Sequence, residues 1–404
     1  MLQRLGSDYG RLWRAAALSN LGDGILLVGG PLVAIQLTRS ATLVAGALVA
    51  LSLPWLLLTL PAGALADRYD RRDLLLGATA MRVAVVAVAG SIALAGSFSL
   101  TVLYVTLFLL GACEVLFDTT SQSMIPSVVA REHLSAANGR LAAAQMIGNQ
   151  FAGFPLAGLL VTFAVAWVFL GPAALFLLAV PALLRMSRGL PPAGRTDATL
   201  GADIREGLGE LFARPVLVRL AALAAVVNIA AGAFNGVFVL YVVGPESPMG
   251  LSEIGYGLLA ALLAAGSVLA SMVVGTLDAR LGPSRLMVVA LLLVAAALTV
   301  PVVSASVTLV ASMLLVLGFG ITLLNVVVVS SRQRIIPNRL LGRVNAAYQL
   351  IGQGAGPVGA LAGGVLADLT SLPTVFLMAS VLILGAALLL GLPLRDRDLA
   401  PSVA

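Results

Sequence analysis

The sequence has 404 residues, of which 60% are hydrophobic and only 10% are charged, and its formal net charge is +6. A mean hydropathy of +1.05 excludes an ordinary soluble globular domain and predicts a membrane protein. The chain holds one cysteine, Cys113, and one histidine, His133. These counts exclude an intramolecular disulfide and a Cys/His zinc site.

Long apolar runs predict that the chain crosses the membrane as helices. A hydrocarbon core of about 30 Å needs roughly 20 apolar residues in a helix, and the runs lack the alternation of a transmembrane barrel. The first run is too long, and too interrupted by Asn20 and Asp23, for a cleaved signal peptide, so we expect it in the mature protein. The twelve predicted spans lie near residues 13–37, 41–65, 74–96, 99–124, 137–162, 164–186, 216–243, 254–277, 285–303, 305–330, 340–367 and 372–393.

The basic residues, all 24 of them arginines, predict the orientation of the spans. With both ends of the chain in the cytoplasm, Arg39 falls outside and Arg82 within a span, which leaves 22 of the 24 on the cytoplasmic side. This asymmetry follows the positive-inside rule and predicts a multi-pass protein of a bacterial cytoplasmic (inner) membrane. Because topology accounts for the positive charge, and no basic stripe alternates with stacking aromatics, we expect no nucleic-acid partner.

Two motifs recur at nearly the same offset. GALADRYDRR begins at Gly63 and GTLDARLGPSR at Gly275, 212 residues later, while the Ile-Pro pairs at Pro126 and Pro337 are 211 residues apart. Such a duplication predicts two six-helix halves in the same orientation, an arrangement found in secondary transporters. A short amphipathic helix is expected in the linker, for which a tethering role is favoured over a regulatory one. The predicted parts are an N-terminal half (1–186), a cytoplasmic linker (187–215) and a C-terminal half (216–404).

Four charged residues lie well away from the ends of the predicted spans: Asp23, Arg82, Glu114 and Asp118. Charges in the membrane are costly and usually face a cavity or each other, and counting from the span ends places all four in one layer. Three carboxylates share one guanidinium, so one of them is expected to bind a proton near neutral pH. The hypothesis is that Asp23 or Glu114 is the coupling acid, with Arg82 as charge partner and Asp118 as modulator. The alternative is a static ion-pair cluster between helices.

The repeat offset maps each acid onto an amide in the second half. Asp23 plus 212 is Asn235, and Glu114 plus 211 is Asn325, while Asn228 shares a helical face with Asn235. These three asparagines are predicted to bind substrate, although hydrogen bonds between helices are an alternative role. An apolar cavity with a few acids and amides favours an amphipathic or cationic small molecule over a sugar.

The loop after the second predicted span resembles a signature of the major facilitator superfamily. The matching residues are Gly63, Asp67, Arg68, Arg71 and Arg72, with Asp70 in place of the usual second glycine. LGDGI, FDTTSQSMIP and GRVNAAYQLIGQGAGPVG look like the drug:proton antiporter branch that contains macrolide-efflux proteins and the enterobactin exporter. The resemblance implies a fold of twelve helices whose first, fourth, seventh and tenth line a central cavity.

The resemblance also implies a cytoplasmic gate. Asp67 would cap the start of the eleventh helix in the outward-open state, while the arginines would bridge neighbouring helices and the lipid surface. The alternative is that the loop only sets topology. The Gly-Pro-x-x-Gly signature of antiporters is altered here to Gly-Phe-Pro-Leu-Ala-Gly, beginning at Gly153.

These observations predict a monomeric, all-α carrier that exports a lipophilic drug or siderophore-like molecule in exchange for protons. No cofactor is expected beyond the proton as coupling ion, and the partners are the substrate and the lipid bilayer. Enzymatic activity is not expected, since His133 is the lone histidine and no Lys exists for a nucleotide-binding loop. The alternatives are a facilitator or importer, including a lipid-moving carrier, and a non-transporting sensor on the same fold.

Overall fold

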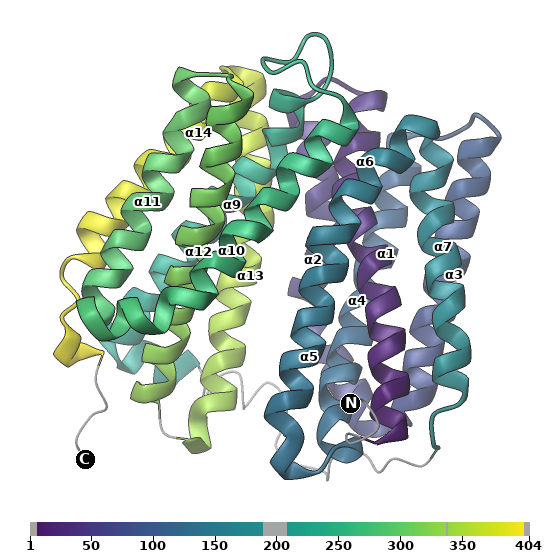
Figure 1. Cartoon of the computed structure of the whole chain (residues 1–404), viewed down its shortest axis with the longest axis horizontal. Helices are drawn as coiled ribbons and strands as arrows, with labels where there is room; N and C mark the ends of the chain where they lie inside the picture. The colour runs from purple at the N-terminus through teal and green to yellow at the C-terminus, as the bar shows by residue number, and fades with distance from the viewer. Residues whose placement is uncertain (1–5, 189–207, 337, 400–404) are drawn as a thin grey trace. The chain divides into compact units, whose positions relative to one another are not determined.

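The computed structural model describes residues 6–188, 208–336 and 338–399, and nearly all of them are helical (Figure 1). The helices are α1 (Ser7–Leu37), α2 (Ala41–Arg68), α3 (Arg71–Leu94), α4 (Leu100–Val128), α5 (Leu134–Met146), α6 (Phe154–Phe163), α7 (Val165–Leu184), α9 (Pro215–Val242), α10 (Glu253–Leu281), α11 (Pro283–Val303), α12 (Val307–Ile335), α13 (Asn338–Leu369) and α14 (Leu372–Ala386).

In the described part of the chain, twelve helical segments are long and apolar enough to cross a membrane. This confirms the predicted number of spans and the all-helical fold class. The fifth span joins α5 to α6 through a π-helical segment, Ile147–Gly153, and the twelfth continues α14 into a second one, Ala387–Gly391. The sequence pattern did not indicate either π-helical segment. α1 begins at Ser7, earlier than the predicted start at residue 13.

Local sequence signals fix where several helices begin. The Asp70 side chain caps α3 by accepting a hydrogen bond of 2.9 Å from the backbone N–H two residues later. Ser99 and Ser371 cap α4 and α14 in the same way, as short polar side chains do at N-caps. Proline opens α9 and α11, where its missing N–H costs no hydrogen bond.

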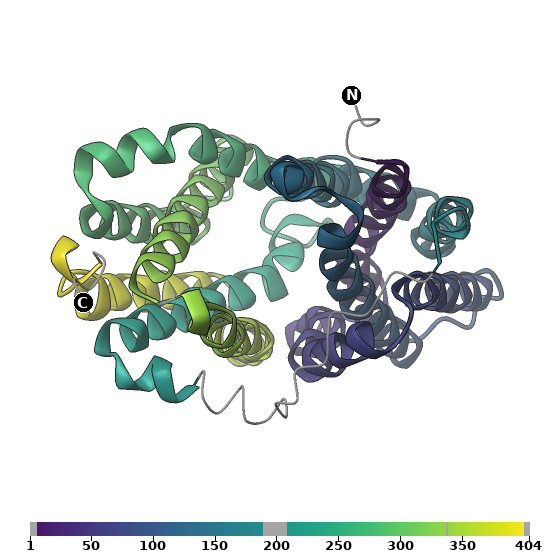
Figure 2. The ribbon, with the colours of Figure 1, turned by 90° about the horizontal axis from the view of Figure 1, so that it is seen from below.

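The chain divides into two compact units, of which the first comprises Met1–Arg39, Gly46–Asp197 and Leu251–Ala261. Within it, α1 packs against α4, α6, α7 and the segment Ile147–Gly153, and α3 packs against α4 and α7 (Figure 1, Figure 2). The most apolar window of α1 is 78% buried. The helices α4, α5, α6 and α7 are therefore arranged around α1.

The second unit comprises Ser40–Ala45, Ala198–Gly250 and Leu262–Ala404. In it α9 packs against α13 and α14, and α11 packs against α12 and α14 (Figure 1). An aromatic cluster joins α9 to α14, since the rings of Phe234, Phe238 and Tyr241 lie 5.5, 6.5 and 5.3 Å from the ring of Phe376. These rings form part of the core of the second unit.

Glycines allow backbones to approach closely within each unit. In the first unit, a Cβ at Gly24 of α1 would collide with the backbone of Asn149 in the π-helical segment. In the second, a Cβ at Gly318 of α12 would collide with the carbonyl oxygen of Leu263 in α10. Small residues at helix contacts are a general means of packing in membranes, where burial of apolar surface gives little driving force.

We predict that Gly318→Ala lowers the melting temperature of the purified protein in detergent. The added methyl group would meet a backbone atom that cannot rotate away, and overpacking of this kind costs about 1 to 3 kcal/mol. Gly385→Ala is the matched control, because its Cβ would find no atom within 4 Å. Equal melting temperatures for the two variants would contradict the packing argument.

Candidate functional site

The first unit brings the four ionisable residues of the predicted layer together. Asp23 comes from α1, Arg82 from α3, and Glu114 and Asp118 from one face of α4. Arg82 Nη1 lies 3.3 Å from Asp23 Oδ2. Both Glu114 and Asp118 lie within electrostatic range of Asp23 and Arg82. The geometry that the sequence predicted for this layer is therefore present.

Arg82 is fully buried and lies close to two aromatic rings. Its guanidinium carbon is 5.0 Å from the ring centroid of Phe117 in α4 and 5.3 Å from that of Phe176 in α7. Among the described residues, Nε and Nη2 have no hydrogen-bond partner. The ion pair with Asp23 and the two aromatic faces are therefore its close favourable contacts, and Glu114 and Asp118 attract it from further away.

The carboxylates differ in their surroundings. Asp23 contacts Arg82 directly, whereas Glu114 has the indole of Trp55 in α2 as a hydrogen-bonding neighbour. The layer would carry a net charge of −2 with all three acids ionised. In the described part of the chain, no group of three or more His, Cys, Asp or Glu side chains has metal-binding geometry.

The predicted substrate-binding asparagines lie in the second unit. Asn228 donates a hydrogen bond of 2.9 Å from Nδ2 to the carbonyl oxygen of Ala224, one turn back in α9. Asn235 is exposed and lines a cavity of about 30 Å³ whose other lining residues are apolar, Ile321 of α12 among them. Asn325 is also exposed, one turn beyond Ile321 on the same helix. A cavity of this volume holds one or two waters, which is too little for a drug-sized ligand.

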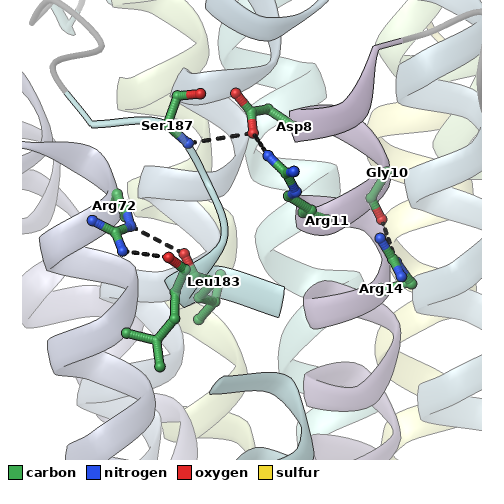
Figure 3. Close-up of polar contacts among 8 residues, drawn as sticks. Asp8, Gly10, Arg11, Arg14, Arg72, Leu183 and Ser187 are labelled. Carbon is green, nitrogen blue, oxygen red and sulfur yellow. Dashed lines mark hydrogen bonds and ion pairs between the residues drawn. The ribbon is translucent and has the colours of Figure 1, made fainter. Parts of the chain in front are cut away.

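Two arginines of the loop signature are buried in the first unit. Arg72 donates hydrogen bonds from Nε to the carbonyl oxygen of Leu183, at 3.1 Å, and from Nη2 to that of the next residue (Figure 3). Arg71 Nη1 lies 3.4 Å from Ser127 Oγ in α4. A cation at the C-terminal end of α7 offsets the partial negative charge of that helix end. These contacts join α3 to its neighbours α4 and α7.

For the remaining signature residues the structure gives burial but no specific contact. Gly63 is partly buried in α2, and Arg68 is exposed at its end. The side chain of Asp67 lies outside the described residues, so the contact predicted for it with the eleventh helix stays a prediction. Of the predicted linker, residues 189–207 lie outside the described residues.

A further polar contact near the Arg72 contact was not predicted. Asp8 Oδ1 accepts hydrogen bonds from Arg11 Nη1, at 2.7 Å, and from the backbone N–H of Ser187, at 3.3 Å (Figure 3). It thereby ties the start of α1 to the chain just after α7. The spacing of Asp8 and Arg11 suggests a helical pair, but nothing in the sequence points to Ser187.

The second copy of the loop makes different contacts. Asp278 pairs with Arg334 at the end of α12, at 3.7 Å. Gly282 has a φ of +79°, and the following helix α11 is capped by a distant residue: Asp396 Oδ1 accepts a hydrogen bond of 2.9 Å from the backbone N–H of Ser284. Hydrogen bonding by Ser284 lowers the pKa of Asp396 below its usual value.

We predict that acid loosens the tie between Asp396 and α11. Because the pKa of Asp396 is lowered on folding, its stabilising effect is present above the unfolded value of 3.8 and is lost as the pH falls through the folded pKa. Hydrogen–deuterium exchange at the first amides of α11, corrected for intrinsic rates, should accelerate in this range. In Asp396→Asn the exchange should already be faster at neutral pH and insensitive to acid. An acid response that persists in this variant would assign the effect to another group.

Comparisons with known proteins agree with this architecture. The family described as transmembrane secretion effector matches residues 7–403 of the chain. The multidrug efflux pump Tap of Mycolicibacterium fortuitum is 28% identical over 408 residues, which cover 96% of each protein.

Solved structures show the same fold. A crystal structure of the nucleoside transporter NupG has a TM-score of 0.82 at 11% identity, covering 96% of this chain and 100% of that chain. A bacterial homologue of the human lysosomal transporter Spinster, in an inward-facing and unoccupied conformation, has a TM-score of 0.73 at 16% identity, covering 98% of each chain. At these identities the likeness concerns the fold alone.

Proposed function

The chain belongs to the transmembrane secretion effector family of major facilitator transporters, and from this premise we propose that it exports a lipophilic or amphipathic small molecule in exchange for protons. As a member of this family it is a multi-pass membrane transporter and not an enzyme. The proposed setting is a bacterial inner membrane, with both termini in the cytoplasm and the chain acting as a monomer. The proposed class of substrate is a drug or a siderophore-like molecule.

The single observation that carries the proposal is the layer of three carboxylates around one buried guanidinium. Asp23 is in contact with Arg82, while Glu114 and Asp118 lie in the same electrostatic field. One cation leaves two carboxylates uncompensated, and repulsion between them in a poorly solvated site favours uptake of a positive charge. A proton or a cationic group of the substrate would supply it. Competition between the two for one site is sufficient to couple their movements in opposite directions.

The relationship to Tap supports export as the direction. Tap is a multidrug efflux pump, and it matches this chain along nearly its whole length. On the substrate side, Asn235, which is surrounded by apolar residues, and the exposed Asn325 would supply hydrogen bonds, which suits an amphipathic molecule better than a sugar. The proton is the proposed coupling ion, and no other cofactor is required.

A facilitator is the second candidate function. The close pair formed by Arg82 and Asp23 would then be a fixed structural element, and the remaining acids would only tune the polarity of the site. Transport by a facilitator would not be coupled to the pH gradient, and this difference allows an experimental decision.

The deciding experiment uses inverted membrane vesicles with an imposed inside-acid pH gradient. Lipophilic cations, macrolides and siderophores are added in turn, and collapse of the gradient is followed by a fluorescent pH probe. We expect at least one compound to discharge the gradient with the wild-type chain. Asp23→Asn and Glu114→Gln should each reduce this discharge at least tenfold, because the neutral side chains cannot exchange a proton.

Glu246→Gln is the matched control, since Glu246 is an exposed acid outside the layer. It should transport like the wild type. If labelled substrate still moves at the wild-type rate in Asp23→Asn and in Glu114→Gln, the protein is a facilitator and proton coupling by this layer is excluded.

A further inference from the structure

The way in which Arg82 is held differs from an ordinary buried ion pair. Its side chain is completely buried, but among the described residues it forms a single ion pair, the 3.3 Å approach of Nη1 to Asp23. Nε and Nη2 find no acceptor among the described residues, although two further carboxylates lie on the adjacent face of α4. A guanidinium normally satisfies several of its five N–H donors when it is buried. The single hydrogen bond to Asp23 therefore accounts for only part of what fixes its position.

Two aromatic rings provide that restraint. Phe117 and Phe176 are 1% and 0% exposed, and their ring centroids lie 5.0 and 5.3 Å from the guanidinium carbon. The negative face of an aromatic ring attracts a cation, most strongly where water is excluded. Because the rings come from α4 and α7, they hold the guanidinium of α3 from both neighbouring helices.

A glycine on α1 makes room for one of these rings. A Cβ at Gly22 would lie 2.6 Å from Cε1 of Phe176, so any larger residue would displace the ring. Gly22 immediately precedes Asp23 in the sequence. The absence of a side chain at this position thus lets the Phe176 ring pack against α1 beside Asp23 while it faces the guanidinium of Arg82.

We propose that Phe117 and Phe176 are positioning residues that keep the Arg82 guanidinium beside Asp23 whether or not Asp23 carries a proton. The inference rests on the proposed proton coupling. The attraction of an aromatic face does not depend on the charge of a carboxylate, so it persists when protonation removes the ionic part of the contact with Asp23. Arg82 then acts as a fixed cation, so that a proton bound at Asp23 changes the charge at that carboxylate without a compensating movement of the guanidinium.

The other groups around Arg82 would otherwise compete for it. Glu114 and Asp118 face it from α4, and the thiol of Cys113 lies within electrostatic range of both Arg82 and Asp23. From α2 the neighbour of Glu114 is Trp55, which does not titrate. α7 and the segment Ile147–Gly153 contain no ionisable residue. Without the rings, nothing would prevent the guanidinium from moving toward Glu114 or Asp118 when Asp23 is protonated.

The first test measures stability and does not require transport. Phe117→Leu and Phe176→Leu are made separately in the wild-type chain and in Arg82→Met, and melting temperatures are measured in detergent. If the rings act on the charge, each Leu substitution should lower the melting temperature at least twice as much in the wild-type chain as in Arg82→Met. The reason is that a cation–π contact can be lost only where Arg82 is present. Phe169→Leu is the matched control, since Phe169 is equally buried in α7 and its ring lies 5.1 Å from that of Phe98 in a tilted arrangement. Its effect should be the same in both backgrounds.

Equal losses for Phe176→Leu and Phe117→Leu in both backgrounds would overturn the proposal and make the rings ordinary packing. If Arg82→Met cannot be purified, Arg82→Gln takes its place in the same cycle.

The second test is the pH profile of transport in vesicles. With Phe176→Leu, the midpoint of the profile should move by about half a pH unit or more relative to the wild type, while Phe169→Leu should leave it unchanged. If transport by the wild type depends on pH and Phe176→Leu has the same midpoint as the wild type, the positioning role is overturned. A wild-type chain whose transport ignores the gradient would instead overturn the proposed function, and the stability cycle would still decide whether the rings act on the charge.

Discussion

The burial of one positive charge in the middle of the first unit is the constraint on which its arrangement depends. A charge near the centre of a bilayer costs about 2.5 to 3.5 kcal/mol on insertion scales, and Arg82 has no access to water. A cation–π contact contributes about 2 kcal/mol when it is desolvated, so two rings and one carboxylate are of the right size to offset the cost. Four elements of the unit, α1, α3, α4 and α7, converge on this side chain. Their positions are therefore linked through a single guanidinium.

Properties that depend on one helix at a time were predictable from the sequence. The twelve spans follow from runs of apolar residues, and the layer of Asp23, Arg82 and Glu114 follows from counting residues from the ends of those spans. Contacts that depend on the rotation of one helix against another were not. Phe176 is one of several phenylalanines in apolar spans, and only the packing of α7 against α1 and α3 distinguishes it. The π-helical segment Ile147–Gly153 was missed for the same reason, because its glycines lie against the backbone of α1 and this contact depends on how the two helices pack.

The loop signature illustrates how one set of residues serves local structure first. Asp70, which departs from the usual glycine, caps α3, and Arg72 binds the last carbonyl groups of α7. Both contacts satisfy backbone groups that helix ends leave without partners. In the second copy, the corresponding helix α11 begins with a proline and receives its cap from Asp396, far along the chain. The two copies therefore cap the helix start with different residues. The loop motif differs between the copies, whereas the capped start of the helix is kept.

The duplication also shows where the charge is confined. Asp23 and Glu114 of the first half correspond to Asn235 and Asn325 of the second, and the second unit surrounds Asn235 with apolar side chains. An amide donates and accepts hydrogen bonds without the desolvation cost of a carboxylate, so no cation is needed beside Asn235. The buried arginine of the second unit, Arg332, lies instead near the end of α12, 3.9 Å from the ring centroid of Tyr348. A second charged layer would double that cost and require its own aromatic support. On the proposed mechanism, confining the titrating groups to the first unit leaves the second free to vary its apolar surface, and with it the substrate, without disturbing the proton site.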